Sequence, residues 1–320
     1  AGPVATDILA LTGNYNGWSG DMVTFLEGIM RSVDAGTKVD YSQGCQMNTA
    51  GSYTGFWEAK MADVVIVCLG NTRMLEGEDG DAMLNTNGGD RTDLRLPESQ
   101  CEYIRLMREN APDKRIIAVI TGGSAIALQD VLEVADAVLF AWYPGEQGGM
   151  ALADILFGKV NPSGRLPVTF YKSTDDLPPF DDYSMKGRTY KYFEGEPLFP
   201  FGYGLSYTSF EYSAIKAETL INEYGKVNFQ VKVSNSGHIA GDEVVMIYAS
   251  KENSIHRYLV GFKRVTLLPG ESCTITTKIN LADMYQWDEK NHRYFVEPGK
   301  YILEVYLPVM KNLKSNINID

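Results

Sequence analysis

The hydrophobic period of this chain changes once along its length, and that change restricts the folds open to it. In residues 23–157, stretches with an apolar stripe at helical spacing alternate with short strand-like runs. The strands are predicted at residues 38–41, 63–69, 115–120 and 137–142, and the helices at residues 23–33, 128–134 and 149–157, with others ending at Met61 and beginning near Pro97. Strand alternating with helix predicts an open, doubly wound, mostly parallel α/β sandwich.

Beyond residue 205 the apolar period becomes two. Val227, Phe229, Val231 and Val233 alternate with polar residues, and Pro-Gly pairs at 269–270 and 298–299 mark turns between further runs. About seven strands in roughly 110 residues, without helices, predict a β-sandwich of the immunoglobulin or fibronectin type III kind.

A segment rich in proline and aromatic residues lies between these two parts. Ordinary loops rarely exceed about 12–15 residues, and flexible linkers favour glycine, serine and charge over aromatic rings. We therefore expect this segment to pack against a neighbouring domain. The predicted organisation is an α/β sandwich domain over residues 1–170, a connector over residues 171–204 and a fibronectin type III-like domain over residues 205–320.

Composition argues against several classes of partner. The chain has 320 residues, with 41 acidic and 29 basic side chains and a formal net charge of −12. Neither nucleic acid nor an anionic membrane surface is therefore an expected partner, and no apolar run reaches the roughly 18 residues of a membrane span. The four cysteines form no CxxC pair, so neither a metal site nor a disulfide framework is predicted.

Motifs for cofactors and for a nucleophilic serine are missing from the sequence. Residues 122–127, GGSAIA, match neither the dinucleotide fingerprint nor the nucleophile elbow, and no phosphate-binding loop is present. His238, His256 and His292 all fall in the predicted β-sandwich, far from Ser124. We expect no cofactor, and carboxylates remain as the candidate catalytic groups.

A long acidic loop, residues 70–96, follows the strongest apolar run. Ligands of open α/β sheets bind beyond the carboxyl ends of the strands, and a loop of this length in a compact layer is usually functional. Its acidic residues are Glu76, Glu78, Asp79, Asp81, Asp90 and Asp93. A solvated acidic loop is the open alternative, whereas calcium binding is disfavoured because the D-x-D-x-D-G spacing is not met.

Several blocks of sequence resemble the carboxyl-terminal half of glycoside hydrolase family 3. They are residues 141–170 (AWYPGEQGGMALADILFGKVNPSGRLPVTF), 187–193 (GRTYKYF) and 200–210 (PFGYGLSYTSF), together with residues 13–17, 23–28, 233–248 and 259–272. The resemblance covers nearly the whole chain. It implies an exo-acting, retaining glycosidase of β-linked oligosaccharides, most often a β-glucosidase and sometimes a β-xylosidase.

The resemblance also assigns catalytic roles. Such enzymes use two carboxylates, which in this family are an aspartate nucleophile on a TIM barrel and a glutamate acid/base on a loop of the α/β domain. Residues 74–78, MLEGE, match the acid/base element and place that role on Glu76, which would need a raised pKa. Glu78 would then face the leaving-group subsite, and a shift of two residues would exchange the two. Residues 89–91, GDR, match an element that we expect to form an ion pair bracing the loop.

The family's barrel is missing from these 320 residues, and the first parallel strand of its α/β domain would precede Ala1. We therefore expect a TIM-barrel domain or chain as a partner that supplies the nucleophile, and we expect this chain alone to be inactive. A non-catalytic carbohydrate-binding or assembly module is the alternative function. Analogy with the family predicts a secreted or periplasmic protein.

Overall fold

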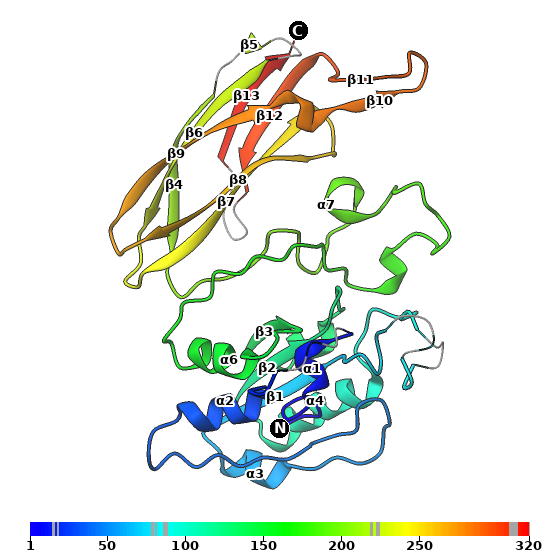
Figure 1. Ribbon diagram of the computed structural model, residues 1–320, viewed down its shortest axis with the longest axis vertical. Helices are drawn as coiled ribbons and strands as arrows, with labels where there is room; N and C mark the ends of the chain where they lie inside the picture. Colours follow the sequence, from blue (N-terminus) through cyan, green and yellow to red (C-terminus); the bar gives the residue numbers. More distant parts are fainter. Residues whose placement is uncertain are drawn as a thin grey trace. The chain divides into compact units, whose positions relative to one another are not determined.

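The computed structural model describes residues 1–14, 17, 19–77, 80, 82–85, 89–217, 220–221, 225–306 and 313–319. The chain forms two compact units (Figure 1). The first unit comprises residues 1–160 and 170–176, and the second comprises residues 161–169 and 177–320. Each unit has its own hydrophobic core.

The first unit is built on a three-stranded parallel sheet in the order β1-β2-β3. Its strands are β1 (Val64–Gly70), β2 (Arg115–Thr121) and β3 (Ala137–Trp142). All three are nearly continuous apolar runs, as strands covered on both faces require. The strands predicted at residues 63–69, 115–120 and 137–142 are confirmed to within one residue at each end.

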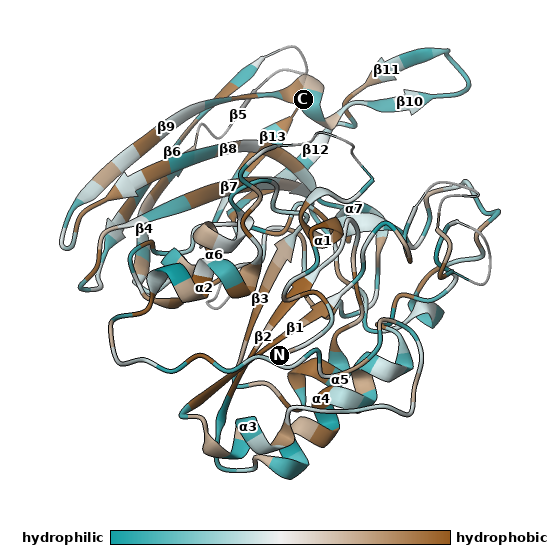
Figure 2. Cartoon of the chain, turned by 60° about the horizontal axis from the view of Figure 1, so that its bottom comes forward, coloured by the Kyte–Doolittle hydropathy of each residue, from teal (hydrophilic) through white to brown (hydrophobic). Residues whose placement is uncertain are grey.

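Helices cover both faces of this sheet (Figure 2). The crossover helices α4 (Glu98–Asn110) and α5 (Gln129–Leu132) lie on one face, because two right-handed crossovers that advance in the same direction fall on the same side of a sheet. The other face carries α1 (Leu9–Thr12), α2 (Phe25–Ser32) and α6 (Gly148–Leu156), and α3 (Phe56–Met61) precedes β1. Phe25 and Leu152 of these helices pack in one core cluster with Val119 of β2.

The short strand predicted at residues 38–41 is wrong. These residues have no strand assignment and join no ladder within the described part of the chain. Their alternate apolar positions are Val39, which is half-buried, and Tyr41, which is 40% exposed. Neither side chain supplies the burial on one face that fixes a strand in a sheet.

Helices α2 and α6 cross with their backbones in contact. A Cβ atom on Gly28 would lie 2.0 Å from the carbonyl oxygen of Gly149, and a Cβ atom on Gly149 would lie 2.0 Å from that of Thr24. The Gly149 N–H also donates to the Val23 carbonyl at 3.0 Å. The crossing of α2 and α6 therefore requires glycine at position 149, the second residue of α6.

Gly149→Ala should therefore destabilise the first unit by about 3 kcal/mol, the upper end of the cost of overpacking a core. Urea unfolding followed by circular dichroism measures the loss. Gly20→Ala is the matched control, because a Cβ atom on Gly20 would meet no atom within 4 Å. Equal stability of the two variants would contradict the close helix crossing.

The second unit is a β-sandwich with an added hairpin. One sheet has the order β4-β6-β9, with β4 (Phe210–Ala217), β6 (Lys226–Asn235) and β9 (Ser272–Asn280). The other has the order β5-β13-β12-β7-β8, with β5 (Leu220–Ile221), β13 (Leu313–Ile319), β12 (Gly299–Val305), β7 (Gly241–Lys251) and β8 (Tyr258–Leu267). The hairpin pairs β10 (Gln286–Asp288) with β11 (Arg293–Phe295). Every pairing within these sheets is antiparallel except that of β5 with β13.

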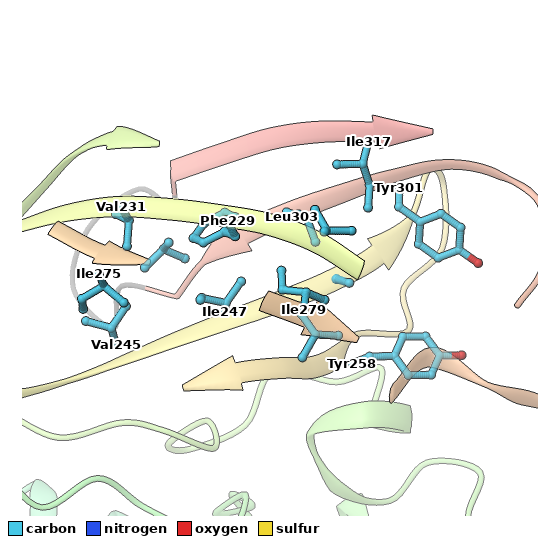
Figure 3. Packing of buried hydrophobic residues seen from close by; sticks show 14 of the residues in the cluster. Phe229, Val231, Val245, Ile247, Tyr258, Ile275, Ile279, Tyr301, Leu303 and Ile317 are labelled. Atoms are coloured by element: carbon cyan, nitrogen blue, oxygen red, sulfur yellow. The ribbon is translucent and has the colours of Figure 1, made fainter. Parts of the chain in front are cut away.

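Alternate residues of β6 fill the core between the two sheets (Figure 3). Phe229 and Val231 of β6 lie in one cluster with Ile247 of β7 and Leu303 of β12. All four are at most 1% exposed. The two-residue period of the sequence therefore places its apolar set on the core face, and the predicted sandwich is confirmed. Short helical turns, η1 (Thr174–Asp176), α7 (Thr189–Tyr192) and η2 (Leu281–Met284), complete the described elements.

Two sequence blocks pair with each other within the second unit. The Leu166 N–H of NPSGRLP donates to the Tyr203 carbonyl at 2.8 Å, and the Gly202 N–H of PFGYGLSY donates to the Leu166 carbonyl at 2.7 Å. Asn161, the first residue of NPSGRLP, donates through Nδ2 to the Ala240 carbonyl at 3.1 Å. These contacts hold NPSGRLP in place within the second unit.

A buried ion pair fixes the same segment to β7. Arg165 and Glu243 are each 7% exposed at the side chain and approach to 2.5 Å. The Tyr212 hydroxyl of β4 donates to the second carboxylate oxygen of Glu243 at 2.8 Å. Burial, reinforced by the Glu243 charge, raises the pKa of Tyr212, so this hydroxyl remains a donor across the physiological range.

Candidate functional site

The candidate site is the start of the acidic loop, where it leaves β1. Gly70 has φ +136°, and a Cβ atom on it would lie 2.2 Å from the Thr121 carbonyl oxygen of β2. The Gln100 side chain of α4 accepts from the Gly70 N–H at 2.7 Å and donates to the Gly70 carbonyl at 3.0 Å. The last residue of β1 is thus held through both its backbone N–H and its carbonyl at the carboxyl edge of the sheet.

A hydrogen-bonded turn then carries the chain to Glu76. The N–H groups of Leu75 and Glu76 both donate to the Thr72 carbonyl, at 2.9 and 3.0 Å. Thr72 is fully buried and Leu75 is 7% exposed, so the turn is packed into the unit rather than solvated. Its geometry brings the Glu76 side chain back towards the sheet edge.

The Glu76 carboxylate has partners on both of its oxygens. Its Oε1 accepts a hydrogen bond from the Ser124 hydroxyl. Its Oε2 accepts from Asn71 Nδ2 at 3.3 Å and lies 3.7 Å from Arg91 Nε. The side chain of Glu76 is 20% exposed and that of Arg91 is 12% exposed, which makes this a largely buried ion pair.

Arg91 connects the loop after β1 to the loop after β2. One of its terminal nitrogens donates to the Ser124 hydroxyl at 2.6 Å and to the Ala125 carbonyl at 3.0 Å, and the other donates to the Leu94 carbonyl at 3.4 Å. The ion pair predicted for the GDR element is confirmed, and its acidic partner is Glu76.

The Tyr143 ring closes the site from the end of β3. A Cβ atom on Gly123 would lie 3.0 Å from Tyr143 Cε2 and 3.9 Å from Glu76 Oε1, so the three residues meet at one point. Burial and the negative charge of Glu76 raise the pKa of Tyr143, which keeps its phenol neutral. The carboxyl ends of all three parallel strands therefore contribute to the surroundings of Glu76, as expected for an open α/β sheet.

The sequence predicted only some of this arrangement. It singled out Glu76 and Arg91, which the structure brings together, whereas Asn71, Ser124 and Tyr143 were not assigned to the site. Ser124 lies just after the carboxyl end of a predicted parallel strand. That position could have identified it as a site residue, because ligands of open α/β sheets bind at this edge. Glu78, Asp79 and Asp81 lie outside the described residues.

Two absences concern only the part of the chain that the structure describes. No group of three or more His, Cys, Asp and Glu side chains there is arranged to hold a metal ion. None of the helices described has both the length and the apolar character to cross a membrane.

Known proteins share both parts of this fold. The Glycosyl hydrolase family 3 C-terminal domain matches residues 2–207, and the Fibronectin type III-like domain matches residues 243–306. A xylan 1,4-beta-xylosidase of Xylanibacter ruminicola is 42% identical over 248 residues, which are 76% of this chain and 28% of that protein. A periplasmic beta-glucosidase of Salmonella typhimurium is 31% identical over 343 residues, which are 94% of this chain and 43% of that protein.

Solved structures agree with the sequence relatives. A beta-D-glucoside glucohydrolase from Trichoderma reesei aligns with a TM-score of 0.81 and 27% identity, over 93% of this chain and 45% of that chain. The parallel α/β layer and the fibronectin type III-like sandwich that follows it match the C-terminal half of glycoside hydrolases. The chain belongs to glycosyl hydrolase family 3. It spans less than half the length of these relatives.

Proposed function

We propose that this chain is part of an exo-acting, retaining β-glycosidase and supplies its general acid/base glutamate from residues 70–96. The aspartate nucleophile would stand on a TIM-barrel domain outside these 320 residues. The observation that carries the proposal is the fixed start of the acidic loop at the carboxyl edge of the sheet, where Glu76 is held by Ser124 and Arg91. The β-glycosidase names of the relatives support the reaction class.

The contacts of Glu76 favour Glu78 as the acid/base. A general acid must place one carboxyl oxygen within hydrogen-bond reach of the leaving-group oxygen. Both oxygens of Glu76 already have partners within its own unit, including a guanidinium. We therefore assign the anchoring of the loop to Glu76 and the proton transfer to Glu78, the exchange that a two-residue shift of the alignment allows.

The proposed substrates are β-linked oligosaccharides cleaved from the non-reducing end. The resemblance to the family favours a terminal glucose, since its members are most often β-glucosidases, and the relatives carry the names of β-glucosidases and β-xylosidases alike. Aryl β-glucoside and aryl β-xyloside, assayed side by side on the complete enzyme, discriminate between these sugars. A higher kcat/KM for the glucoside is the result expected from the resemblance to the family.

A covalent label tests the division of labour between the domains. With a dinitrophenyl 2-deoxy-2-fluoro glycoside, a carboxylate oxygen of the nucleophile bonds to the anomeric carbon as the phenolate leaves without needing a proton. The fluorine slows hydrolysis of this ester, so it accumulates and can be located by peptide mass spectrometry. The label should appear on an aspartate outside these 320 residues, and a label on a peptide of this chain would overturn the proposal.

A further inference from the structure

Ser124 joins two loops that are far apart in the sequence. Its hydroxyl donates to Glu76 Oε1 on the loop after β1 and accepts from Arg91 at 2.6 Å. A hydroxyl has one proton to donate and lone pairs to accept with, so this arrangement uses both capacities. Ser124 itself belongs to the loop after β2, which places it at the carboxyl end of the neighbouring strand.

The two ends of the acidic segment are held at this one point. Glu76 lies near its beginning and Arg91 near its end, and their side chains meet each other and Ser124. Arg91 also donates to the Ala125 carbonyl at 3.0 Å. Glu76 and Arg91 are therefore fixed to each other and to the loop after β2 at the carboxyl edge of the sheet, and joining two distant points of a chain restricts the conformations open to it.

We propose that Ser124 and Arg91 are positioning residues for the acid/base glutamate. This inference rests on the proposed function, with Glu78 as the acid/base. Glu78 follows Glu76 by two residues, and two residues of extended chain span at most about 7 Å, so the position of Glu76 limits where the Glu78 carboxyl can reach. Ser124 and Arg91 act through Glu76, and neither transfers the proton.

The consequence for catalysis depends on the leaving group. A displacement of about 1 Å in a catalytic group can cost about 10²-fold in rate. The cost falls on substrates whose leaving group must be protonated, and a leaving group that departs as a stable anion escapes it. Loss of folded enzyme, in contrast, reduces the rate on every substrate by the same factor.

Ser124→Ala in the complete enzyme tests the inference. We expect kcat/KM to fall by about 10²-fold on a natural disaccharide and to change little on a 2,4-dinitrophenyl glycoside. Ser124→Thr, which keeps the hydroxyl, should restore most of the loss. Ser52→Ala replaces an exposed serine of the same unit and should leave both substrates unaffected.

Two results would overturn the inference, and the variant Glu78→Ala distinguishes them from failure of the proposed function. An equal loss on both substrates for Ser124→Ala would assign Ser124 a structural role, and no loss would remove any role. Glu78→Ala is measured in parallel on the same substrates. If Glu78→Ala discriminates between the leaving groups and Ser124→Ala does not, only the positioning role fails; if Glu78→Ala does not discriminate, the assigned acid/base is wrong and the positioning role falls with it.

Discussion

Glu78→Ala in the complete enzyme should lower kcat/KM for a natural disaccharide by about 10²–10⁴-fold, the usual contribution of a positioned general acid. A sugar alkoxide is a poor leaving group and needs a proton as the glycosidic bond breaks. Dinitrophenolate leaves without one, so kcat/KM for a dinitrophenyl glycoside, which reports on steps up to the glycosyl-enzyme, should change little. Steady-state kinetics on the two substrates measures the difference.

The same variant should slow the second half of the reaction. A retaining glycosidase reuses its acid as the base that activates water against the glycosyl-enzyme. With the dinitrophenyl glycoside, kcat should therefore fall although kcat/KM does not. A burst of dinitrophenolate equal to the enzyme concentration is the expected pre-steady-state signature.

Glu76→Ala provides the comparison for the two glutamates. It removes the anchor of the loop and leaves the proposed acid in place, so we expect a smaller loss on the disaccharide, of about 10²-fold. A larger and more leaving-group-dependent loss for Glu76→Ala than for Glu78→Ala would return the acid/base role to Glu76.

Arg165→Met should destabilise the second unit by about 3–5 kcal/mol, because it leaves the Glu243 carboxylate buried without its cation. That is a large part of the 5–15 kcal/mol that stabilises an ordinary domain. Urea unfolding of the 320-residue chain measures this loss. It is followed by tryptophan fluorescence, to which the second unit contributes Trp287 of β10. The double variant R165M/E243Q should recover part of the loss, since a neutral amide can still accept from Tyr212.

Arg264→Met is the matched control in the same unit. Arg264 pairs with Asp242, but its side chain is 63% exposed, and exposed pairs contribute about 0–1 kcal/mol. The midpoint of unfolding should therefore barely move. Equal losses for Arg165→Met and Arg264→Met would contradict the account of a buried, stabilising pair between NPSGRLP and β7.

The parts of the fold that the sequence predicted are those with a local signal. The run at residues 63–69 is apolar at nearly every position, which fixes both the strand and its burial on two faces. Residues 38–41 gave a weaker pattern with one half-buried valine, and no strand forms there. The hairpin of β10 and β11 was not singled out, because strands of three residues carry too little periodicity.

The candidate site depends on contacts between strand ends, which no local pattern encodes. Arg91 was expected to form an ion pair, but its partner Glu76 lies fifteen positions earlier. Ser124 lies 48 positions beyond Glu76, and only the parallel register of β1 with β2 brings their loops together. The resemblance to the family located the loop, and the structure identified which side chains hold it.

Azide rescue of Glu78→Ala tests the central claim most directly. Removal of the acid/base carboxyl leaves room for a small anion, which needs no base to attack the anomeric carbon of the glycosyl-enzyme and displace the nucleophile's carboxylate. With the dinitrophenyl glycoside and added sodium azide, kcat should recover and the product should be the β-configured glycosyl azide, the outcome of two inversions. No rescue for Glu78→Ala, or rescue for Glu76→Ala instead, would contradict the claim that Glu78 of this chain is the acid/base.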